Sequence, residues 1–423
     1  MFELPRGTRD FLPEEMQKRR FIEKKLRFVF ESYGYHEIQT PTFENLELFT
    51  AKSGEGIINE LYSFTDKGNR ELALRPELTA PVMRLYVENL QMKAKPLKLF
   101  YFGNCYRYDR PQKGRYREFT QAGCELIGTD SSEAIAELIS MAYQLLHKLS
   151  LQNITLEIGN LRLLSLLFNY LGLNDDQRSQ LIPLIDKDEY EEVRSLLDSF
   201  ALDDTKTQWF LDVLQIQDIN ILTTALSSVK EVSEHLTRMQ EICSFLDIHL
   251  DDFPYRINLG IVRGLDYYTG VVFEMKAPSL GAEKQILGGG EYDLISLFGG
   301  RALPTAGFAL GFDRTLLAMD EEHILFPQSS LDYYVIPITS EMREQAFKVC
   351  RILRNQGFLV DVDLMRRGIG KSLKYANNQN ARFALLIGPD EFEKGFLILR
   401  DMQQGTQEEL TYKELSSLRK IPK

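Results

Sequence analysis

The sequence predicts an α+β protein in which an antiparallel sheet carries a helical insertion and precedes a small α/β domain. Length is one reason, because 423 residues exceed the roughly 250–300 at which a single hydrophobic core stops growing. Patterning is another, because period-two stretches occur on both sides of a long helical segment, whereas helices and strands alternate regularly only near the end of the chain. We predict a large domain over residues 1–327, interrupted by helices over 161–250, and a second domain over 328–423.

The N-terminal part predicts one long helix followed by paired strands. Apolar positions recur at helical spacing from Pro13 to Tyr33, and "YGYHEIQTPTFE" then changes to strand-like alternation. Two aromatic, period-two stretches, "PLKLFYFGNCYRYD" and "REFTQAGCELIG", predict strands. The interval between them is too long for a tight hairpin, and loops of that length usually have a function.

The middle of the chain predicts helices and then a return to strands. "SEAIAELISMAYQLLHKL" begins with a serine and acids suited to a helix start. Between Leu161 and Leu250, short helical patterns carry 7 basic and 16 acidic residues, a net charge of −9, which disfavours nucleic-acid binding. "INLGIVRGLDYYTGVVFEM" and "ILGGGEYDLISLFGG" predict strands, and "TAGFALGFDRTLLAM" predicts a strand that leads into a helix.

The C-terminal segment predicts a small α/β domain. The strand patterns "DYYVIPI", "FLVDVDL" and "ARFALLIG" are separated by the helical stretches "REQAFKVCRILRNQG" and "GKSLKYANNQN". From Leu331 onward the charge is 15 basic minus 12 acidic residues, or +3, so the rest of the chain carries −14. Positive charge is therefore segregated in this domain.

Composition and spacing exclude several classes of protein. No apolar run approaches the roughly 18 residues of a membrane span, and "MFELPRGTRDF" is unlike a signal peptide, so we expect a cytoplasmic protein without a membrane partner. Cys105, Cys124, Cys243 and Cys350 form no C-x-x-C pair, which predicts buried thiols rather than a zinc site or disulfides. The five histidines lack the spacing of metal ligands or of a catalytic triad.

A polar row along the second aromatic strand is the first candidate site. Alternate strand residues share a face, so we expect one row made of Arg117, Phe119, Gln121, Gly123 and Glu125. Gly123 would keep this row open. A solvated sheet face also explains such alternation, but the adjoining basic loop favours a binding site, because arginine captures phosphate through two parallel hydrogen bonds.

Three further stretches add charged and aromatic residues. "LRPELTAP" places Arg75, Glu77 and Thr79 at alternate positions. "VRGLDYYTG" brackets Arg263 and two tyrosines with glycines, and "GFDRT" sets Arg314 at a helix start. Each stretch alone also fits a surface charge or a core tyrosine. The sequence has neither a P-loop nor a dinucleotide-binding GxGxxG. The arginines of these stretches nevertheless predict a site for a nucleoside triphosphate, and the carboxylates predict a partner that is an amine or an imidazolium.

These stretches resemble the class II aminoacyl-tRNA synthetases, and specifically the histidyl-tRNA synthetase family. "GYHEIQTP" is similar to motif 1, "YRYDRPQKGRYREFTQAGCELIG" to motif 2 and "AGFALGFDRTLLAM" to motif 3. "RGLDYYTGVVFE", "GGGEYDLISLFGG" and "RPELTA" resemble stretches peculiar to the histidine enzymes. The resemblance implies an antiparallel catalytic sheet of six or seven strands, a helical insertion, a C-terminal anticodon-binding domain and a homodimer formed through motif 1.

The resemblance also implies a reaction and its site residues. L-histidine and ATP, with Mg²⁺, form histidyl-adenylate, and histidine then moves to the 3′ end of tRNA(His). By position, the histidine-binding residues are Glu77, Thr79 and Gln121 at the amino group, Glu125 and Tyr268 at the imidazole, and Tyr292 in the pocket lining. The ATP-binding residues are Arg107 and Arg263 at the α-phosphate, where both are catalytic, Arg314 at the γ-phosphate and Phe119 at the adenine.

Two groups of basic and polar residues are the implied RNA contacts. The motif 2 loop, Arg110 to Arg117, would meet the tRNA acceptor end through Gln112, Arg115 and Arg117. In the C-terminal domain, the basic cluster consists of Arg366, Arg367, Lys371 and Lys374.

One residue departs from the family pattern, because Glu291 stands where the glycine-rich stretch usually has arginine. This difference predicts a reversed charge beside the pocket. Two non-aminoacylating alternatives share the fold: a regulatory subunit of ATP phosphoribosyltransferase and a tRNA-sensing binding protein. The C-terminal domain, which the subunit typically lacks, opposes the first alternative, and the presence of Arg107, Arg263 and Arg314 opposes the second.

Overall fold

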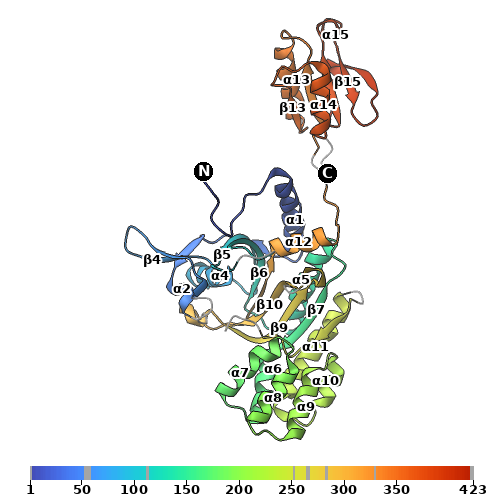
Figure 1. Cartoon of the computed structure of the whole chain (residues 1–423). Helices are drawn as coiled ribbons and strands as arrows, with labels where there is room; N and C mark the ends of the chain where they lie inside the picture. The colour runs from blue at the N-terminus through green and yellow to red at the C-terminus, as the bar shows by residue number, and fades with distance from the viewer. Residues whose placement is uncertain are drawn as a thin grey trace. The chain divides into compact units, whose positions relative to one another are not determined.

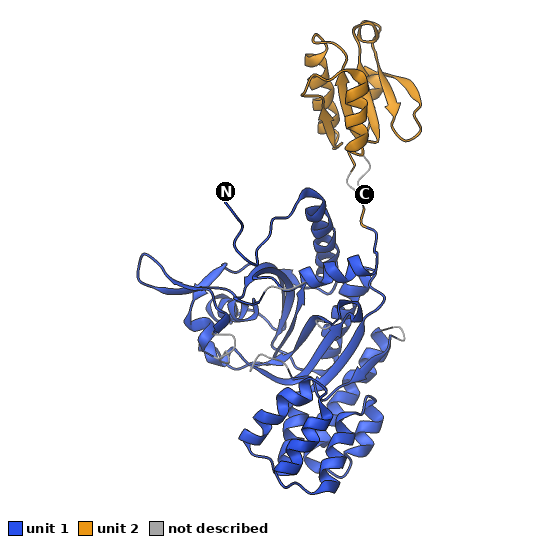
Figure 2. Ribbon diagram, viewed as in Figure 1, with its two compact units in different colours: residues 1–325 blue, residues 326–423 orange. Residues whose placement is uncertain are grey.

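The computed structural model describes residues 2–51, 59–110, 114–250, 253–262, 267–281, 284–327 and 330–419. The chain divides into two compact units, Met1–Leu325 and Phe326–Lys423 (Figure 2). This division falls in the same segment as the predicted boundary between residues 327 and 328. Each unit has its own sheet and its own hydrophobic core.

An eight-stranded sheet forms the centre of the first unit (Figure 1). Its order is β1-β5-β6-β11-β10-β9-β7-β8, with antiparallel neighbours except at the outer pairs β1–β5 and β7–β8. The strands are β1 (His36–Glu37), β5 (Leu97–Tyr106), β6 (Glu118–Ile127), β7 (Thr155–Asn160), β8 (Tyr255–Ile257), β9 (Tyr268–Lys276), β10 (Gln285–Tyr292) and β11 (Thr305–Gly311). The resemblance implied six or seven strands, and the described residues form eight, with the short strands β1 and β8 at the two edges.

The two aromatic stretches form the predicted strands β5 and β6, whose side chains alternate between two packed faces. Phe100 faces helix α1 (Pro13–Ser32), where its ring stacks on Phe30 with centroids 4.9 Å apart. Tyr101 points to the other face and packs with residues of helix α4 (Thr79–Leu85) in one buried cluster. Both faces of the sheet are therefore covered.

Helices α1, α5 (Ser132–Lys148), α11 (Ser233–His249) and α12 (Phe312–Glu321) pack against one another beside the sheet (Figure 1). Helix α1 has Pro13 at its first position, as the sequence predicts. Helix α5 begins at Ser132, and its N-cap is Ser131, one residue before the serine expected to start the helix. The Ser131 side chain accepts a hydrogen bond from the Ala134 backbone N–H at 3.3 Å.

The segment predicted as a helical insertion is helical throughout most of its length. Its other helices are α6 (Leu161–Leu171), α7 (Asp175–Asp186), α8 (Tyr190–Ser199), α9 (Asp204–Leu214) and α10 (Ile219–Ala225). Figure 1 shows α6 to α10 gathered into one group, whereas α11 runs back along α5. The last helix of the segment therefore packs with the layer beside the sheet.

Smaller elements complete the first unit. A three-stranded sheet of order β2-β4-β3 precedes α4 in the sequence. These elements are β2 (Phe43–Asn45), α2 (Glu47–Thr50), β3 (Ser63–Thr65), β4 (Glu71–Leu74), a π-helical turn (Tyr86–Leu90) and 3-10 turns at Lys230–Val232, Pro278–Leu280 and Ser296–Phe298. Among the described residues of the whole chain, no helix has both the length and the apolar character needed to cross a membrane.

The second unit has a five-stranded sheet of order β13-β12-β14-β15-β16. Its elements are β12 (Tyr333–Pro337), α13 (Arg343–Asn355), β13 (Val360–Val362), α14 (Ile369–Asn378), β14 (Phe383–Ile387), α15 (Pro389–Glu393), β15 (Phe396–Asp401), β16 (Gln407–Thr411) and α16 (Tyr412–Ser417). The first five of these alternate as predicted. Two buried clusters, one containing Val349 of α13 and the other Ala376 of α14, cover the two sheet faces.

Candidate active site

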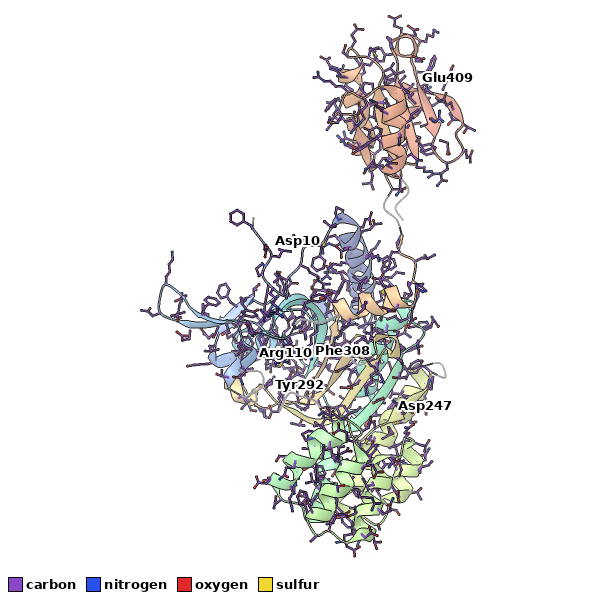
Figure 3. All side chains as sticks on the ribbon, in the orientation of Figure 1. Asp10, Arg110, Asp247, Tyr292, Phe308 and Glu409 are labelled. Carbon is purple, nitrogen blue, oxygen red and sulfur yellow. The ribbon has the colours of Figure 1, made fainter. Side chains whose placement is uncertain are left out.

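A cavity of about 910 Å³ lies over strands β6, β9, β10 and β11 of the large sheet. This volume is within the roughly 300–1,000 Å³ of small-molecule sites. Figure 3 labels Tyr292 on β10 and Phe308 on β11, which both line the cavity. The lining includes nine of the residues that the sequence predicts for the site: Glu77, Thr79, Arg107, Arg115, Phe119, Gln121, Tyr268, Tyr292 and Arg314.

The pairing of β5 with β6 sets which side chains meet at this face. Phe119, Gln121 and Glu125 lie opposite alternate residues of β5, and Gly123 lies opposite Tyr101. A Cβ added at Gly123 would lie 2.6 Å from the Tyr101 hydroxyl oxygen. Gly123 was expected to leave space for a ligand above the row, and this expectation is wrong. The Tyr101 side chain fills the space above Gly123.

Glu125 lies behind the cavity wall, with 1% of its surface exposed. Its carboxylate accepts a hydrogen bond from the Tyr101 hydroxyl at 3.0 Å and another from the Tyr292 hydroxyl. Burial raises the pKa of Glu125 to about 8, although the hydrogen bonds from Tyr292, Thr79 and Tyr101 oppose the rise. Glu125 is thus a buried carboxyl group held between two phenols, not a solvated sheet acid.

Glu77 and Thr79 meet at the start of helix α4. The Glu77 carboxylate accepts hydrogen bonds from the backbone N–H groups of Thr79 and Ala80, the latter at 3.0 Å, and so caps the helix. Burial raises the pKa of Glu77, while these N–H groups and the charge of Arg107 act in the opposite direction. Glu77 is only 8% exposed, which excludes the alternative of a surface acid.

Two of the predicted phosphate-binding arginines are anchored to backbone carbonyl groups. Arg107 donates from Nε to the Pro76 carbonyl at 2.9 Å, and its guanidinium carbon lies 5.4 Å from the centre of the Phe119 ring. Arg314 lies in the first turn of α12 and donates from Nη1 to the Gln285 carbonyl at 3.0 Å. Each guanidinium group is therefore fixed in direction while it lines the cavity.

The loop between β5 and β6 holds its arginines in two different ways. Arg115 forms an ion pair with Asp109 and lines the cavity. Arg117 lies one residue before β6, its carbonyl accepts the Arg107 N–H at 3.0 Å, and it is not among the residues that line the cavity. Its guanidinium carbon lies 3.9 Å from the centre of the Tyr108 ring. Gln112 and Arg263 lie outside the described residues.

Glu291 does not place a negative charge in the cavity, and the prediction of a reversed charge beside the pocket is corrected here. Its carboxylate pairs with the guanidinium of Arg238 on α11, with one contact of 2.9 Å, and accepts the Val271 N–H at 2.8 Å. Glu291 is 9% exposed and is not one of the residues that line the cavity. Its charge is therefore compensated within the sheet and the helix behind it.

Sequence reasoning missed several polar residues of the cavity wall. Asp186 and Asp188 reach it from the end of α7, and Asp186 accepts the Val262 N–H at 3.2 Å. Glu274 and Lys276 reach it from β9 and lie 3.6 Å apart. The acidic segment had no pattern that distinguished these two aspartates from its many solvated acids. The alternation of β9 could have indicated Glu274 and Lys276, which are two residues apart on one face.

The described residues contain no group of three or more His, Cys, Asp or Glu side chains suited to a metal ion. All four cysteines are buried and free. Burial raises the pKa of Cys105 to about 12, and its thiol donates to the Gln121 side-chain oxygen at 3.3 Å. A thiol with such a pKa is a structural group rather than a nucleophile.

In the second unit, the basic cluster lies around the start of α14. Arg366, Lys371 and Lys374 are exposed. Arg367 is instead held by Asp363, at 2.7 Å, and its guanidinium carbon lies 4.3 Å from the centre of the Tyr375 ring. The cluster therefore presents three exposed cations and one that is fixed in place.

An antiparallel sheet with arginines from the β5–β6 loop and from the helix after the last strand defines a class II aminoacyl-tRNA synthetase. The family model described as histidyl-tRNA synthetase matches residues 7–315, and that of an anticodon binding domain matches residues 332–420. The chain belongs to the histidyl-tRNA synthetase family.

Named relatives extend over both units. A histidine–tRNA ligase of Archaeoglobus fulgidus is 44% identical over 98% of this chain and 99% of its own length. A histidine–tRNA ligase of Methanosarcina acetivorans is 46% identical over 97% of each chain. Among solved structures, the apo histidyl-tRNA synthetase of S. aureus has a TM-score of 0.74 and 29% identity, covering 98% of this chain and 99% of that one.

Proposed function

We propose that the protein is a histidine–tRNA ligase, which activates L-histidine with ATP as histidyl-adenylate and transfers it to the 3′ end of tRNA(His). The observation that carries this proposal is the buried Glu125 carboxyl group between Tyr101 and Tyr292, next to a cavity lined by Arg107 and Arg314. This arrangement places a polar pocket suited to an imidazole beside cations suited to a triphosphate.

The proposed histidine pocket has hydrogen-bonding groups for the imidazole on two different strands. A carboxylate has about four lone-pair positions, so Glu125 keeps acceptor capacity beside its two tyrosine bonds, and Tyr268 engages the second imidazole nitrogen. Tyr268 lies opposite Tyr292 in the β9–β10 pair, which supports a shared pocket. Glu77, Thr79 and Gln121 then hold the α-amino group.

The nucleotide side of the site relies on positioning and charge. Arg107 and Arg263 contact the α-phosphate, Arg314 contacts the γ-phosphate, and Phe119 stacks on the adenine. The substrate carboxylate is itself the nucleophile, so no protein base is needed. As it attacks the α-phosphorus, negative charge grows on the non-bridging oxygens, and guanidinium groups fixed beforehand stabilise this charge without reorganising.

We assign Mg²⁺ as the companion of the nucleotide, because carboxylate and phosphate oxygens are its usual ligands. Of the mostly buried carboxylates that line the cavity, Glu77 caps α4, and Asp109 and Asp313 pair with arginines. Glu274 is 14% exposed and has a looser contact of 3.6 Å with Lys276, so we assign the metal to it. The metal would neutralise phosphate charge, and most of its other ligands would be phosphate oxygens and water.

For the tRNA, we assign the acceptor end to Gln112, Arg115 and Arg117, and the anticodon to the cluster formed by Arg366, Arg367, Lys371 and Lys374. Residues 1–327 form the catalytic domain, with the insertion over 161–250, and residues 328–423 form the anticodon-binding domain. We further propose a homodimer that works in the cytoplasm. The two non-aminoacylating alternatives are less well supported, because the named ligases match along both units.

The function is tested by charging a tRNA(His) transcript with radiolabelled histidine and ATP. We expect charging that depends on histidine and on the 3′ terminal adenosine. Transcripts with and without the extra 5′ nucleotide typical of histidine tRNA would reveal whether the β5–β6 loop contributes. Tight tRNA binding without any charging would favour the tRNA-sensing alternative.

A further inference from the structure

Two arginines share one buried carboxylate beside the cavity. Arg9, from the segment before α1, and Arg19, within α1, each lie 2.5 Å from the same oxygen of Asp313. The second Asp313 oxygen accepts the Thr120 N–H at 3.1 Å. The side chain of Asp313 is 4% exposed, and that of Arg19 is 10% exposed.

The charges of this cluster do not balance. Two guanidinium groups and one carboxylate leave a surplus of one positive charge, in a place where burial strengthens electrostatic interactions. Arg19 also donates to the Thr120 hydroxyl at 2.6 Å, so Asp313 is already satisfied by Arg19 and the Thr120 N–H. Arg9 is therefore not needed to neutralise Asp313, and it adds repulsion between the two arginines.

Aromatic rings hold Arg9 in place. Its guanidinium carbon lies 3.6 Å from the centre of the Tyr116 ring and 4.7 Å from that of Phe11. Among the described residues, its Nε and Nη2 are buried and form no hydrogen bond, although Nη2 lies within ion-pair distance of Asp313. A buried donor without an acceptor is uncommon and calls for an explanation. Stacking fixes the arginine, whose side chain keeps 26% of its surface exposed.

The neighbours of Arg9 belong to the cavity wall. Tyr116, Thr120, Asp313 and Arg314 all line the cavity, and Arg9 lies directly behind Tyr116 and Asp313 without lining it itself. We propose that Arg9 is a further anion-binding residue of this site, whose surplus charge is compensated by the polyphosphate of a nucleoside triphosphate or by pyrophosphate. The identity of the anion rests on the proposed function, whereas the charge imbalance does not.

Four full-length variants, two at Arg9 and two controls, separate ligand binding from structure. Arg9→Met keeps an unbranched stem without the guanidinium group and leaves the Arg19–Asp313 pair intact. We expect its affinities for ATP and for inorganic pyrophosphate, measured by calorimetry, to fall about tenfold, the worth of one charge-assisted hydrogen bond. Its melting temperature and its affinity for histidine should match the parent. Arg9→Lys, which retains the charge, should recover part of the ATP and pyrophosphate affinity.

The matched controls are Arg6→Met and Arg19→Met. Arg6 is an exposed arginine of the same segment, and its replacement should leave all three affinities unchanged. Arg19→Met should lower the melting temperature, because this buried arginine bonds both Asp313 and Thr120. If Arg9→Met binds ATP and pyrophosphate within twofold of the parent, the inference is wrong. It is equally wrong if Arg9→Met behaves like Arg19→Met and loses stability and histidine affinity together.

These outcomes are distinct from failure of the proposed function. A parent protein that binds ATP and pyrophosphate through Arg9 but never charges tRNA would contradict the function and leave the role of Arg9 intact. A variant with unchanged anion affinity, in a parent that charges tRNA normally, would contradict only the role of Arg9.

Discussion

The Tyr101 hydroxyl donates a hydrogen bond of 3.0 Å to the carboxyl group of Glu125 on the adjacent strand. Tyr292 approaches the same carboxyl group from β10, and Thr79 adds a further hydrogen bond. Burial raises the pKa of Glu125 to about 8, and the nearby charge of Glu77 contributes to the rise. At neutral pH a larger share of Glu125 is therefore protonated in the free protein than of an exposed glutamate.

This raised pKa predicts a pH dependence of histidine use. The ionised carboxylate is the form that accepts a hydrogen bond from an imidazole N–H. For the parent, kcat/KM for histidine in pyrophosphate exchange should rise as the pH approaches about 8, because this parameter reports ionisation in the free enzyme. Free histidine titrates in the same pH range. Dividing the parent's pH profile of kcat/KM by that of Glu125→Gln cancels this titration and leaves the contribution of Glu125.

The same variant tests the pocket assignment. Glu125→Gln cannot ionise, so its defect should be largest at high pH, where we expect the KM for histidine to rise about tenfold, the worth of roughly 1.4 kcal/mol. The defect should shrink at low pH, where the parent is protonated too. If kcat and KM stay within about twofold of the parent at every pH, Glu125 does not contact the substrate.

Arg238→Met tests the account of Glu291. It should leave a buried carboxylate without its cation and lower the free energy of unfolding by about 1–3 kcal/mol, measured with denaturant. Adding Glu291→Gln, which keeps an acceptor for the Val271 N–H, should restore much of the loss. Histidine KM should change little in either variant, because neither residue lines the cavity. A large change in KM at unchanged stability would indicate a direct role in substrate binding.

Arg263 lies outside the described residues, so the prediction for it rests on the sequence. Arg263→Lys keeps the charge but loses the planar pair of donors. We expect normal folding and histidine binding, with kcat for exchange reduced on the order of 10²–10³, as for removal of one preorganised donor. A melting curve and an exchange rate on the same variant distinguish catalysis from structure. Near-parental exchange in a well-folded variant would exclude the catalytic role.

The exposed cations of the second unit should matter for tRNA and not for adenylate formation. Combining Arg366→Ala with Lys371→Ala should raise the KM for tRNA about tenfold at low salt and less at higher salt, because the variant has fewer phosphate contacts and its affinity therefore depends less on released counterions. Exchange, which needs no tRNA, should be unchanged. The matched control replaces Lys394 and Lys413, which are also exposed in this unit. Equal effects in both pairs would mean that general charge, not this cluster, binds the RNA.

Local sequence patterns predict the helices and strands, and they predict which residues of a strand share one face. Helix α1 and strands β5 and β6 follow from periodicity that lies within each segment. The face shared by Phe119, Gln121 and Glu125 follows from the two-residue repeat of one strand. These features depend on neighbours in the sequence, so a single sequence is enough to indicate them.

Local patterns do not predict ion pairs between residues that are far apart in the sequence. Arg238 and Glu291 are 53 residues apart, and Arg19 and Asp313 are 294 residues apart. No local pattern indicates that one charge will meet the other, so the charge of Glu291 could not be assigned to its partner beforehand. The same reason explains why Asp186, at the end of an otherwise solvated acidic segment, was missed as part of the cavity wall.

Histidine-dependent exchange of radiolabelled pyrophosphate into ATP tests the central claim most directly. The reaction needs the histidine pocket, the phosphate-binding arginines and the nucleophilic attack, but it needs neither tRNA nor the second unit. We expect exchange that starts on addition of L-histidine and is absent with other amino acids. A folded protein that binds ATP yet exchanges no pyrophosphate in the presence of histidine would contradict the proposal.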